Sequence, residues 1–247
     1  KEEDNKVEVE NSNIDENSQT IEQNTVYKLQ ETKAEESIKL EKELSSTESE
    51  IIGLYDPEEY SLSIDMWANS DGLNLKELFQ NLENFKLSKD ASEIMQVSLL
   101  TNAHYPRLNI TEQEFLSFKS KWLINNTNLD LIEEYLIKNQ IINQHPELTK
   151  HLVDSYLSES NIKKACEIFS KNTEVLQDEY LSKFSLYCLI NYGKNEEAQL
   201  ILDLKKELGF EDNYYENKIN YLFGYLDEAD KEISINSILD FHLAHRT

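Results

Sequence analysis

A pattern of mostly apolar residues recurs three times in the second half of the chain, and it constrains the fold more than any other feature. Each copy has four positions separated by 4, 9 and 4 residues, and successive copies are shifted by 34 and 33 residues. A spacing of four puts two side chains on one face of a helix. The copies are Phe118, Trp122, Leu131 and Tyr135; Leu152, Tyr156, Ala165 and Phe169; and Ser185, Leu189, Ala198 and Leu202. The pattern predicts helix-turn-helix units that bury their faces against one another, clearest over residues 112–209.

Glycine and proline are rare, with five and three occurrences in 247 residues, which favours helices joined by short polar turns. No segment alternates in the manner of a strand. Helical spacing also extends beyond the repeat: in "ASEIMQVSLLTNAHYP", Ile94, Val97 and Leu100 share a face before Pro106, which we expect to stop the helix. A further helix pair is expected from residue 213 to residue 245. We therefore predict an all-α fold over residues 51–247, built as an array of antiparallel helix pairs.

Two other helices have clear apolar stripes. "NLKELFQNLENF" places Leu75, Leu78, Phe79 and Leu82 on one face, and "NEEAQLILDLKKELG" places Ala198, Ile201, Leu202 and Leu208 on one side before Gly209. Glycine after the last apolar position is a common helix end. Both stripes are expected to face the core.

The middle unit, "LVDSYLSESNIKKACEIFS", resembles the tetratricopeptide repeat, whose leucine, tyrosine, small residue and phenylalanine it matches at Leu152, Tyr156, Ala165 and Phe169. Large residues of the first helix fill the space that the small residue leaves open. The family's glycine is replaced by Lys119, Val153 and Leu186, and its late proline is absent, so the repeat is a divergent one. The resemblance implies an α-solenoid that acts as a non-catalytic scaffold and binds a protein or peptide partner on its concave face.

In the family register, the positions two before and two after the first repeat position face that concave groove. They are Leu116 and Ser120, Lys150 and Asp154, and Lys183 and Tyr187. The chain also contains thirteen tyrosines, some of which we expect on the concave surface, since tyrosine buries area and keeps a hydroxyl for hydrogen bonding.

The order of the segments is also similar to that of uncharacterised alphaproteobacterial envelope proteins that begin with an export signal. The chain begins at Lys1, which fits a removed leader or a fragment of a longer protein. We expect an exported protein of the periplasm or cell envelope, with the cytoplasm as the alternative. Because "FHLAHRT" ends inside a helical pattern, the alternative function is the non-catalytic helical part of a larger cell-envelope enzyme, such as a lytic transglycosylase.

Residues 1–50 contain six lysines and fifteen acidic residues and so carry a charge of 6 − 15 = −9. Few of them are apolar, and burial there cannot offset the loss of chain entropy on folding. We expect a disordered acidic tail, with a single helix over residues 27–44 as the alternative.

The rest of the chain carries −24 + 9 = −15 and holds only two arginines, Arg107 and Arg246. Nucleic acids and anionic membrane surfaces require a basic surface, so neither is an expected partner. No apolar run reaches the roughly 18 residues that a membrane span needs. The sequence gives no indication of oligomeric state.

The stretch "GLYDPEEYSLSIDMWANSDG", residues 53–72, gathers carboxylates and aromatic residues, but it fails as a calcium loop because Trp67 and Leu78 fall at ligand positions. Its acids could form a catalytic carboxylate pair, but acids are so abundant throughout the chain that we do not expect one. We favour a turn at residues 56–57, a helix cap at Ser70 or Asp71, and packing of Trp67 beneath that helix. A loop that contacts a partner is the alternative.

No residue pattern predicts a catalytic, metal or cofactor site. The pairs His242 with His245 and His145 with His151 each lack further ligands, so we expect partly exposed helix histidines. No serine lies in a glycine-flanked elbow, and no glycine-rich phosphate loop is present. The two cysteines, Cys166 and Cys188, lie in apolar helical patterns and are expected to be buried thiols, although their pairing is left open.

Overall fold

The computed structural model describes residues 51–170, 172 and 174–247. The predicted acidic tail of residues 1–50 and its alternative helix lie outside these residues. Residues 51–247 form one compact unit.

The fold is all-α, as predicted from the apolar spacing. The residues that the structure describes contain ten α-helices, one short 3-10 helix and no strand. In chain order the elements are η1 (Glu58–Tyr60), α2 (Gly72–Glu83), α3 (Lys89–Leu100), α4 (Glu112–Asn126), α5 (Leu129–Asn139), α6 (Pro146–Ser158), α7 (Ile162–Glu167), α8 (Glu179–Asn191), α9 (Asn195–Glu207), α10 (Asn213–Leu222) and α11 (Ile238–Arg246).

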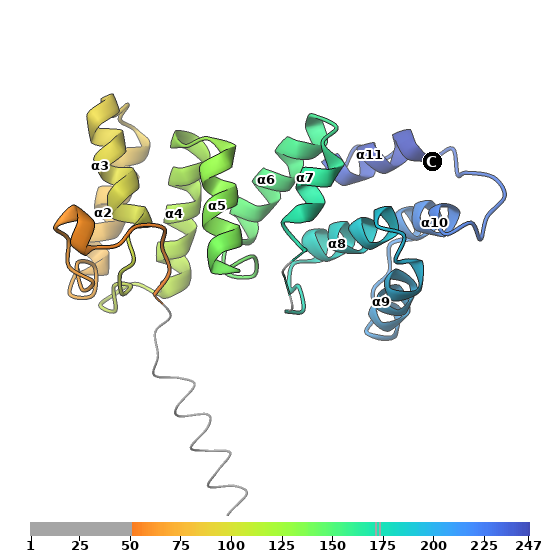
Figure 1. Ribbon diagram of the computed structural model, residues 1–247, viewed down its shortest axis with the longest axis horizontal. Helices are drawn as coiled ribbons and strands as arrows, with labels where there is room; N and C mark the ends of the chain where they lie inside the picture. The colour runs from red at the N-terminus through yellow and green to blue at the C-terminus, as the bar shows by residue number, and fades with distance from the viewer. Residues whose placement is uncertain (1–50, 171, 173) are drawn as a thin grey trace, which may run out of the picture. The chain divides into compact units, whose positions relative to one another are not determined.

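The three copies of the apolar pattern fall on the pairs α4–α5, α6–α7 and α8–α9 (Figure 1), with Phe169 in the turn that follows α7. The two helices of the second and third pairs pack together, and α6 also packs against α4, α5 and α8. Of the eleven apolar pattern residues, all but Leu131 and Leu189 are buried, and those two are half-buried. The apolar pattern therefore supplies most of the core in this part of the fold.

Side-chain caps define where most of these helices begin. Thr111 and Glu114 form a reciprocal capping box at the start of α4, and Asp178 caps α8 by accepting a hydrogen bond from the Leu181 amide. Such caps satisfy amide groups that have no partner within the helix. The polar residues between the apolar stripes thus fix the helix starts.

Residues 53–72, the entry segment, run along the connection between α3 and α4 as extended chain and turns. The Leu54 amide donates to the Leu100 carbonyl, and the Gly72 amide donates to the Leu108 carbonyl. A Cβ atom at Gly72 would lie 2.3 Å from the Ile110 Cβ, so only glycine allows this approach. The entry segment is held to the helices by backbone contacts at both of its ends.

The turn and the helix cap expected in the entry segment are confirmed, and Trp67 contacts α4 and α3. The Pro57 carbonyl accepts the Tyr60 amide in the expected turn, and the Asp71 side chain caps α2 by accepting the Leu73 amide at 2.8 Å. Trp67 packs on Phe115, with ring centroids 5.5 Å apart, and its Nε1 donates to the backbone of Ser98. These residues anchor the entry segment to the core.

Two stripe predictions need correction. Helix α3 ends at Leu100 rather than near Pro106, because Thr101 takes an extended backbone and lies in a parallel bridge with Tyr55 of the entry segment. Ile94 is exposed and does not share the buried face of Leu100. In α2, Leu75 and Phe79 are buried, while Leu78 is exposed.

The expectation of two buried thiols was wrong, because Cys166 of α7 and Cys188 of α8 form a disulfide. Both cysteines are buried, and their Cα atoms lie 5.4 Å apart, within the usual range for a bridge. The disulfide joins two helices that belong to successive pairs.

Candidate peptide-binding groove

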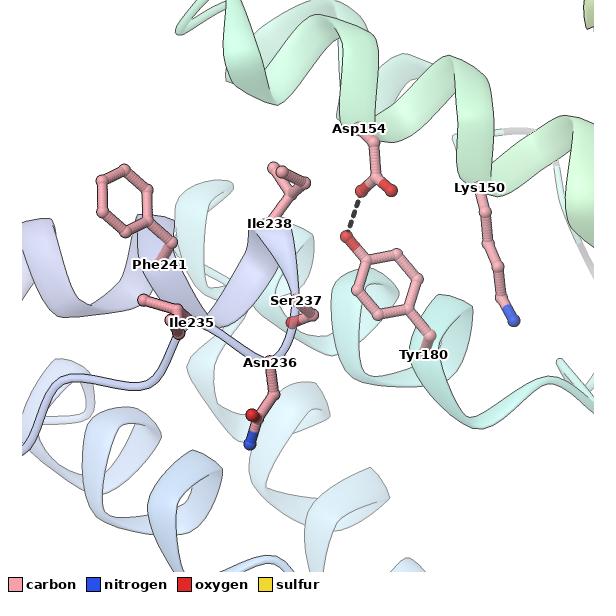
Figure 2. Close-up of a pocket in the computed structure, with 8 residues that line it drawn as sticks. All are labelled: Lys150, Asp154, Tyr180, Ile235, Asn236, Ser237, Ile238 and Phe241. Carbon is pink, nitrogen blue, oxygen red and sulfur yellow. Dashed lines mark hydrogen bonds between the residues drawn. The ribbon is translucent and has the colours of Figure 1, made fainter.

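An open groove lies where the C-terminal segment passes the first helices of the second and third pairs. It has a volume of about 610 Å³. Helix α6 supplies one wall, the start of α8 supplies a second, and residues 235–241 supply the third (Figure 2). The lining side chains are Lys150, Asp154, Tyr180, Ile235, Asn236, Ser237, Ile238 and Phe241. Pockets of this size commonly accommodate small ligands or individual side chains of a peptide.

Asp154 and Tyr180 form the polar centre of the groove. The Tyr180 hydroxyl donates to Asp154 Oδ1, as Figure 2 shows. Burial raises the pKa of the Asp154 carboxyl, while the hydrogen bond from Tyr180 and the nearby His151 and Lys150 oppose that rise. Burial and the hydrogen bond to Asp154 together raise the pKa of Tyr180. The pair is a fixed hydrogen-bonding group on one side of the groove.

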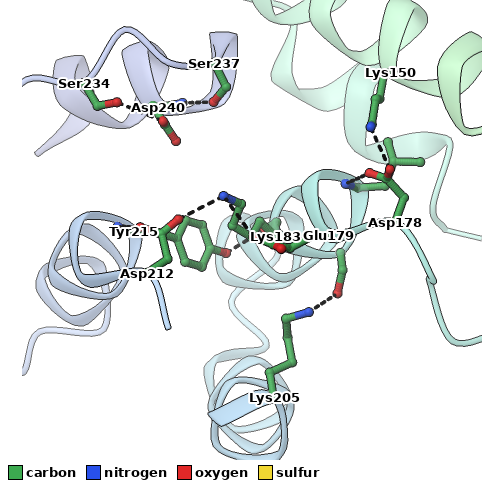
Figure 3. A network of polar contacts seen from close by, with 12 residues as sticks. Lys150, Asp178, Glu179, Lys183, Lys205, Asp212, Tyr215, Ser234, Ser237 and Asp240 are labelled. Carbon is green, nitrogen blue, oxygen red and sulfur yellow. Dashed lines mark hydrogen bonds and ion pairs between the residues drawn. The ribbon is translucent and has the colours of Figure 1, made fainter. Parts of the chain in front are cut away.

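The lysines on this side of the fold are held in ion pairs. Lys150 Nζ lies 2.6 Å from Asp178 Oδ2, and Lys183 Nζ lies 2.9 Å from Asp212 Oδ2 (Figure 3). Asp178 also caps α8, so its pairing with Lys150 ties α6 to the start of α8. The pair holds the Lys150 ammonium at Asp178, and its charge still opposes the rise in the Asp154 pKa that burial causes.

The opposite wall is apolar and exposed. Ile235, Ile238 and Phe241 all have large exposed fractions and line the groove. Ser237 caps α11 by accepting the Asp240 amide, and the Ser234 hydroxyl donates to Asp240 Oδ2 (Figure 3). These hydrogen bonds fix the turn that presents the apolar side chains.

Helix α11 itself packs against α6, and two of its own residues, Leu239 and Leu243, are fully buried. His242 Nε2 lies 3.0 Å from the Tyr187 hydroxyl of α8, and Arg246 donates to the same hydroxyl at 2.6 Å. The C-terminal helix therefore covers part of the surface that a regular array of helix pairs would leave open.

This arrangement corrects the predicted groove positions. Lys150 and Asp154 line the groove, whereas Lys183 is half-buried in its ion pair beside it. The prediction was wrong for three residues that are buried: Leu116, Ser120 and Tyr187. Ser120 is covered because α4 and α6 pack directly together, and Tyr187 is covered by α11. Tyr180 lines the groove, although its position was not singled out from the sequence.

A polar cluster that the sequence did not reveal lies in the core between α4, α5 and the start of α6. His145 Nδ1 is 2.7 Å from Ser120 Oγ, and its Nε2 is 2.9 Å from the Tyr135 hydroxyl. The Lys119 ammonium lies 4.4 Å from the centroid of the Tyr135 ring. We expected His145 to be partly exposed, and that prediction was wrong. The side chain is buried because it lies where α4, α5 and the start of α6 meet. A lysine at position 119, where the tetratricopeptide pattern has glycine, was the signal in the sequence that could have indicated this cluster.

The other predicted histidine pair does not converge on one site. His242 faces Tyr187, while the His245 ring packs edge-on against Phe241 with centroids 4.6 Å apart. Among residues 51–170, 172 and 174–247, no group of three or more histidine, cysteine or acidic side chains could hold a metal ion. No helix in the same residues is both long and apolar enough to cross a membrane.

Comparisons with protein-family models, curated proteins and solved structures found no match to this chain. The residues of the groove themselves indicate what kind of ligand it could bind. A carboxylate with its phenol donor lies on one wall, and three apolar side chains lie on the other. Such a combination suits a ligand side chain that has an apolar stem and a cationic end.

Proposed function

We propose that this chain is a non-catalytic scaffold that binds a protein or peptide through the groove between α6, α8 and residues 235–241. The observation that carries the proposal is the Asp154–Tyr180 pair facing exposed Ile235, Ile238 and Phe241 across an open groove. Exposed apolar side chains beside oriented polar groups are characteristic of recognition surfaces.

The preferred ligand is a peptide that carries lysine or arginine next to an apolar residue. Tyr180 occupies only Oδ1 of Asp154, and a ligand cation would pair with the remaining oxygen. The chain's formal net charge of −24 would also speed the approach of a basic ligand. A hydrogen bond and an ion pair to the Asp154 carboxylate would fix the position of the peptide along the groove. The apolar wall would bury the peptide's apolar side chain.

The test is a selection from a random peptide library on the full chain, followed by affinity measurements on two groove variants. Asp154→Asn removes the charge but keeps an acceptor for Tyr180, and Phe241→Ser removes the largest apolar side chain of the groove. Each variant should lower the affinity for the selected peptides by about tenfold or more, because the loss of one ion pair or apolar contact costs roughly 1.4 kcal/mol of binding free energy.

The matched controls are Glu134→Gln and Ile94→Ser, which change an exposed carboxylate and an exposed apolar residue outside the groove. They should leave the affinity unchanged. Failure to select any peptide, or equal losses in the groove variants and the controls, would contradict the proposal.

We also propose that the chain works in an oxidising compartment, such as the periplasm or cell envelope. The disulfide between Cys166 and Cys188 supports this location, because disulfides persist in exported proteins and are rare in the cytosol. The chain isolated from its native cells without reductant should react with a thiol-alkylating reagent only after reduction and unfolding. Alkylation of both cysteines in unfolded, unreduced chain would favour the cytoplasm instead.

A further inference from the structure

Helix α9 has a second apolar surface that lies apart from the groove. Leu200, Leu204 and Leu208 are 70%, 54% and 80% exposed and follow one another at intervals of four residues. We call these three residues, of which Leu208 is the C-cap of the helix, the α9 leucine stripe. Ala198 and Leu202 are fully buried on the other face of the helix, which packs against α8. The prediction that Leu208 faces the core was therefore wrong: the helix has an inner apolar face and a separate outer one.

Acidic residues border the α9 leucine stripe. Glu196, Glu197, Asp203 and Glu207 are all exposed, and helical geometry places each within about one residue step of the stripe. Of these four acids, only Glu197 forms an ion pair within the part of the chain that the structure describes. Its partner is Lys194, whose Nζ lies 3.2 Å from Glu197 Oε2. The outer face of α9 is thus a row of leucines with a carboxylate border.

The lysines of α9 are turned away from the stripe. Lys205 reaches back to α8, where its Nζ donates to Ser182 Oγ at 2.9 Å, and Figure 3 shows it extending from α9 towards that helix. Lys206 pairs with Glu216 of α10, with the charged atoms 2.5 Å apart. Neither lysine neutralises the carboxylate border.

The carboxylate border favours some binding partners of the α9 leucine stripe over others. A second copy of the chain would bring its own carboxylate border against the first, and like charges in a contact are unfavourable. Residues 1–50 carry a charge of −9 and are disfavoured for the same reason. A partner with a positive border satisfies both the leucines and the carboxylates.

We propose that the α9 leucine stripe docks an amphipathic helix of another protein, whose apolar positions are flanked by lysine and arginine. Leucines at intervals of four residues match the apolar side chains at i, i+3, i+4 and i+7 of such a helix. This surface is independent of the groove, so the chain has two separate sites for partners.

The experiment uses the full chain and a synthetic helix with leucine at helical spacing and lysine elsewhere, followed by fluorescence anisotropy. The triple variant Leu200→Gln, Leu204→Gln, Leu208→Gln should weaken binding by at least about tenfold. The matched control Leu73→Gln, Leu78→Gln, Ile94→Gln removes three other exposed apolar residues and should bind as the unaltered chain does. Circular dichroism of both variants verifies that the helices are retained.

A second arm tests the carboxylate border. Glu196→Gln, Asp203→Asn and Glu207→Gln together should weaken the lysine helix and reduce the salt dependence of its binding. The control Glu77→Gln, Glu134→Gln, Asp227→Asn removes the same number of exposed charges elsewhere. A helix with glutamate in place of lysine should not bind.

Equal binding of the lysine and glutamate helices, or wild-type affinity in the leucine variant, would overturn the proposal. So would a dimer of the unaltered chain in sedimentation velocity that the leucine variant loses, because the stripe would then be occupied by a second copy. Because the groove is also proposed to take lysine beside an apolar residue, the titration is repeated with Asp154→Asn and with Phe241→Ser. Unchanged binding in these variants assigns the helix to the α9 leucine stripe, and its loss there would overturn the proposal.

Discussion

Lys119 is buried in the core, and its ammonium lies over the face of the Tyr135 ring. Burial lowers the pKa of its ammonium to about 7, and the same burial, together with the charge on Lys119, lowers the pKa of His145 well below its ordinary value. The hydroxyls of Ser120 and Tyr135 satisfy both nitrogens of the neutral histidine. This cluster gives the fold a dependence on pH.

Stability should therefore rise with pH above about pH 7. The unfolded chain keeps the Lys119 proton up to its ordinary pKa of 10.5, whereas the folded chain releases it near 7. Between these values unfolding takes up a proton, which adds up to about 1.4 kcal/mol of stability per pH unit. Urea unfolding at about pH 7 and about pH 9 measures the slope.

Lys119→Met is the matched variant, because methionine keeps the unbranched stem and removes the charge. It should be more stable than the unaltered chain at pH 7 and should lose most of the slope. An equal slope in both proteins would show that Lys119 does not carry this dependence. Below pH 6.5, both should lose stability as the unfolded chain protonates His145 first.

Phe169 tests the apolar pattern at one position. It is buried, and its ring lies 5.6 Å from that of Phe184 in the next pair. Phe169→Ala should lower the free energy of unfolding by roughly 3 to 5 kcal/mol through lost burial and a cavity. A loss below about 1 kcal/mol, as at surface sites, would place this side chain outside the core.

At the scale of elements, the entry segment depends on close backbone contact with the α3–α4 connection. Gly72→Ala would bring a methyl group to within 2.7 Å of the Asn109 backbone, so the first turn of α2 or residues 109–110 must shift. We expect the free energy of unfolding, measured with urea, to fall by about 1 to 3 kcal/mol, as it does at other overpacked sites.

Leu73→Ala, at the next position of α2, is the control for Gly72→Ala. Leu73 is exposed, so its truncation should change stability by less than about 0.5 kcal/mol. A cost for Gly72→Ala no larger than that of the control would mean that the entry segment is not held in the position described.

The sequence predicted most helices but not all of their faces. Spacings of four identified α4 to α9 because buried side chains recur on one face of each helix. The end of α3 was missed because Thr101 leaves the helix to meet Tyr55, a contact between residues far apart in the chain. The outward face of Leu208 was missed because α9 has apolar residues on two faces, and spacing alone does not tell which is covered.

At the scale of the whole molecule, the C-terminal segment forms one wall of the proposed groove. The family register predicted Lys150 and Asp154 in the groove, but not Tyr180, Ile235 or Phe241. Ile235 and Phe241 join the site through the packing of α11 on α6, and Tyr180 joins it through the packing of α8 on α6. Both contacts bring together segments distant in sequence and leave no local pattern. The groove proposed for ligand binding therefore includes an apolar wall from the chain's own C-terminal segment.

Hydrogen exchange of the full chain, with and without a library-selected peptide, tests the groove proposal most directly. The peptide should slow exchange in α6, the start of α8 and residues 235–246, and Asp154→Asn should reduce that protection at the same peptide concentration. Protection confined to α9 or to the α2–α3 region, with α6 and α11 unchanged, would contradict the groove as the binding site.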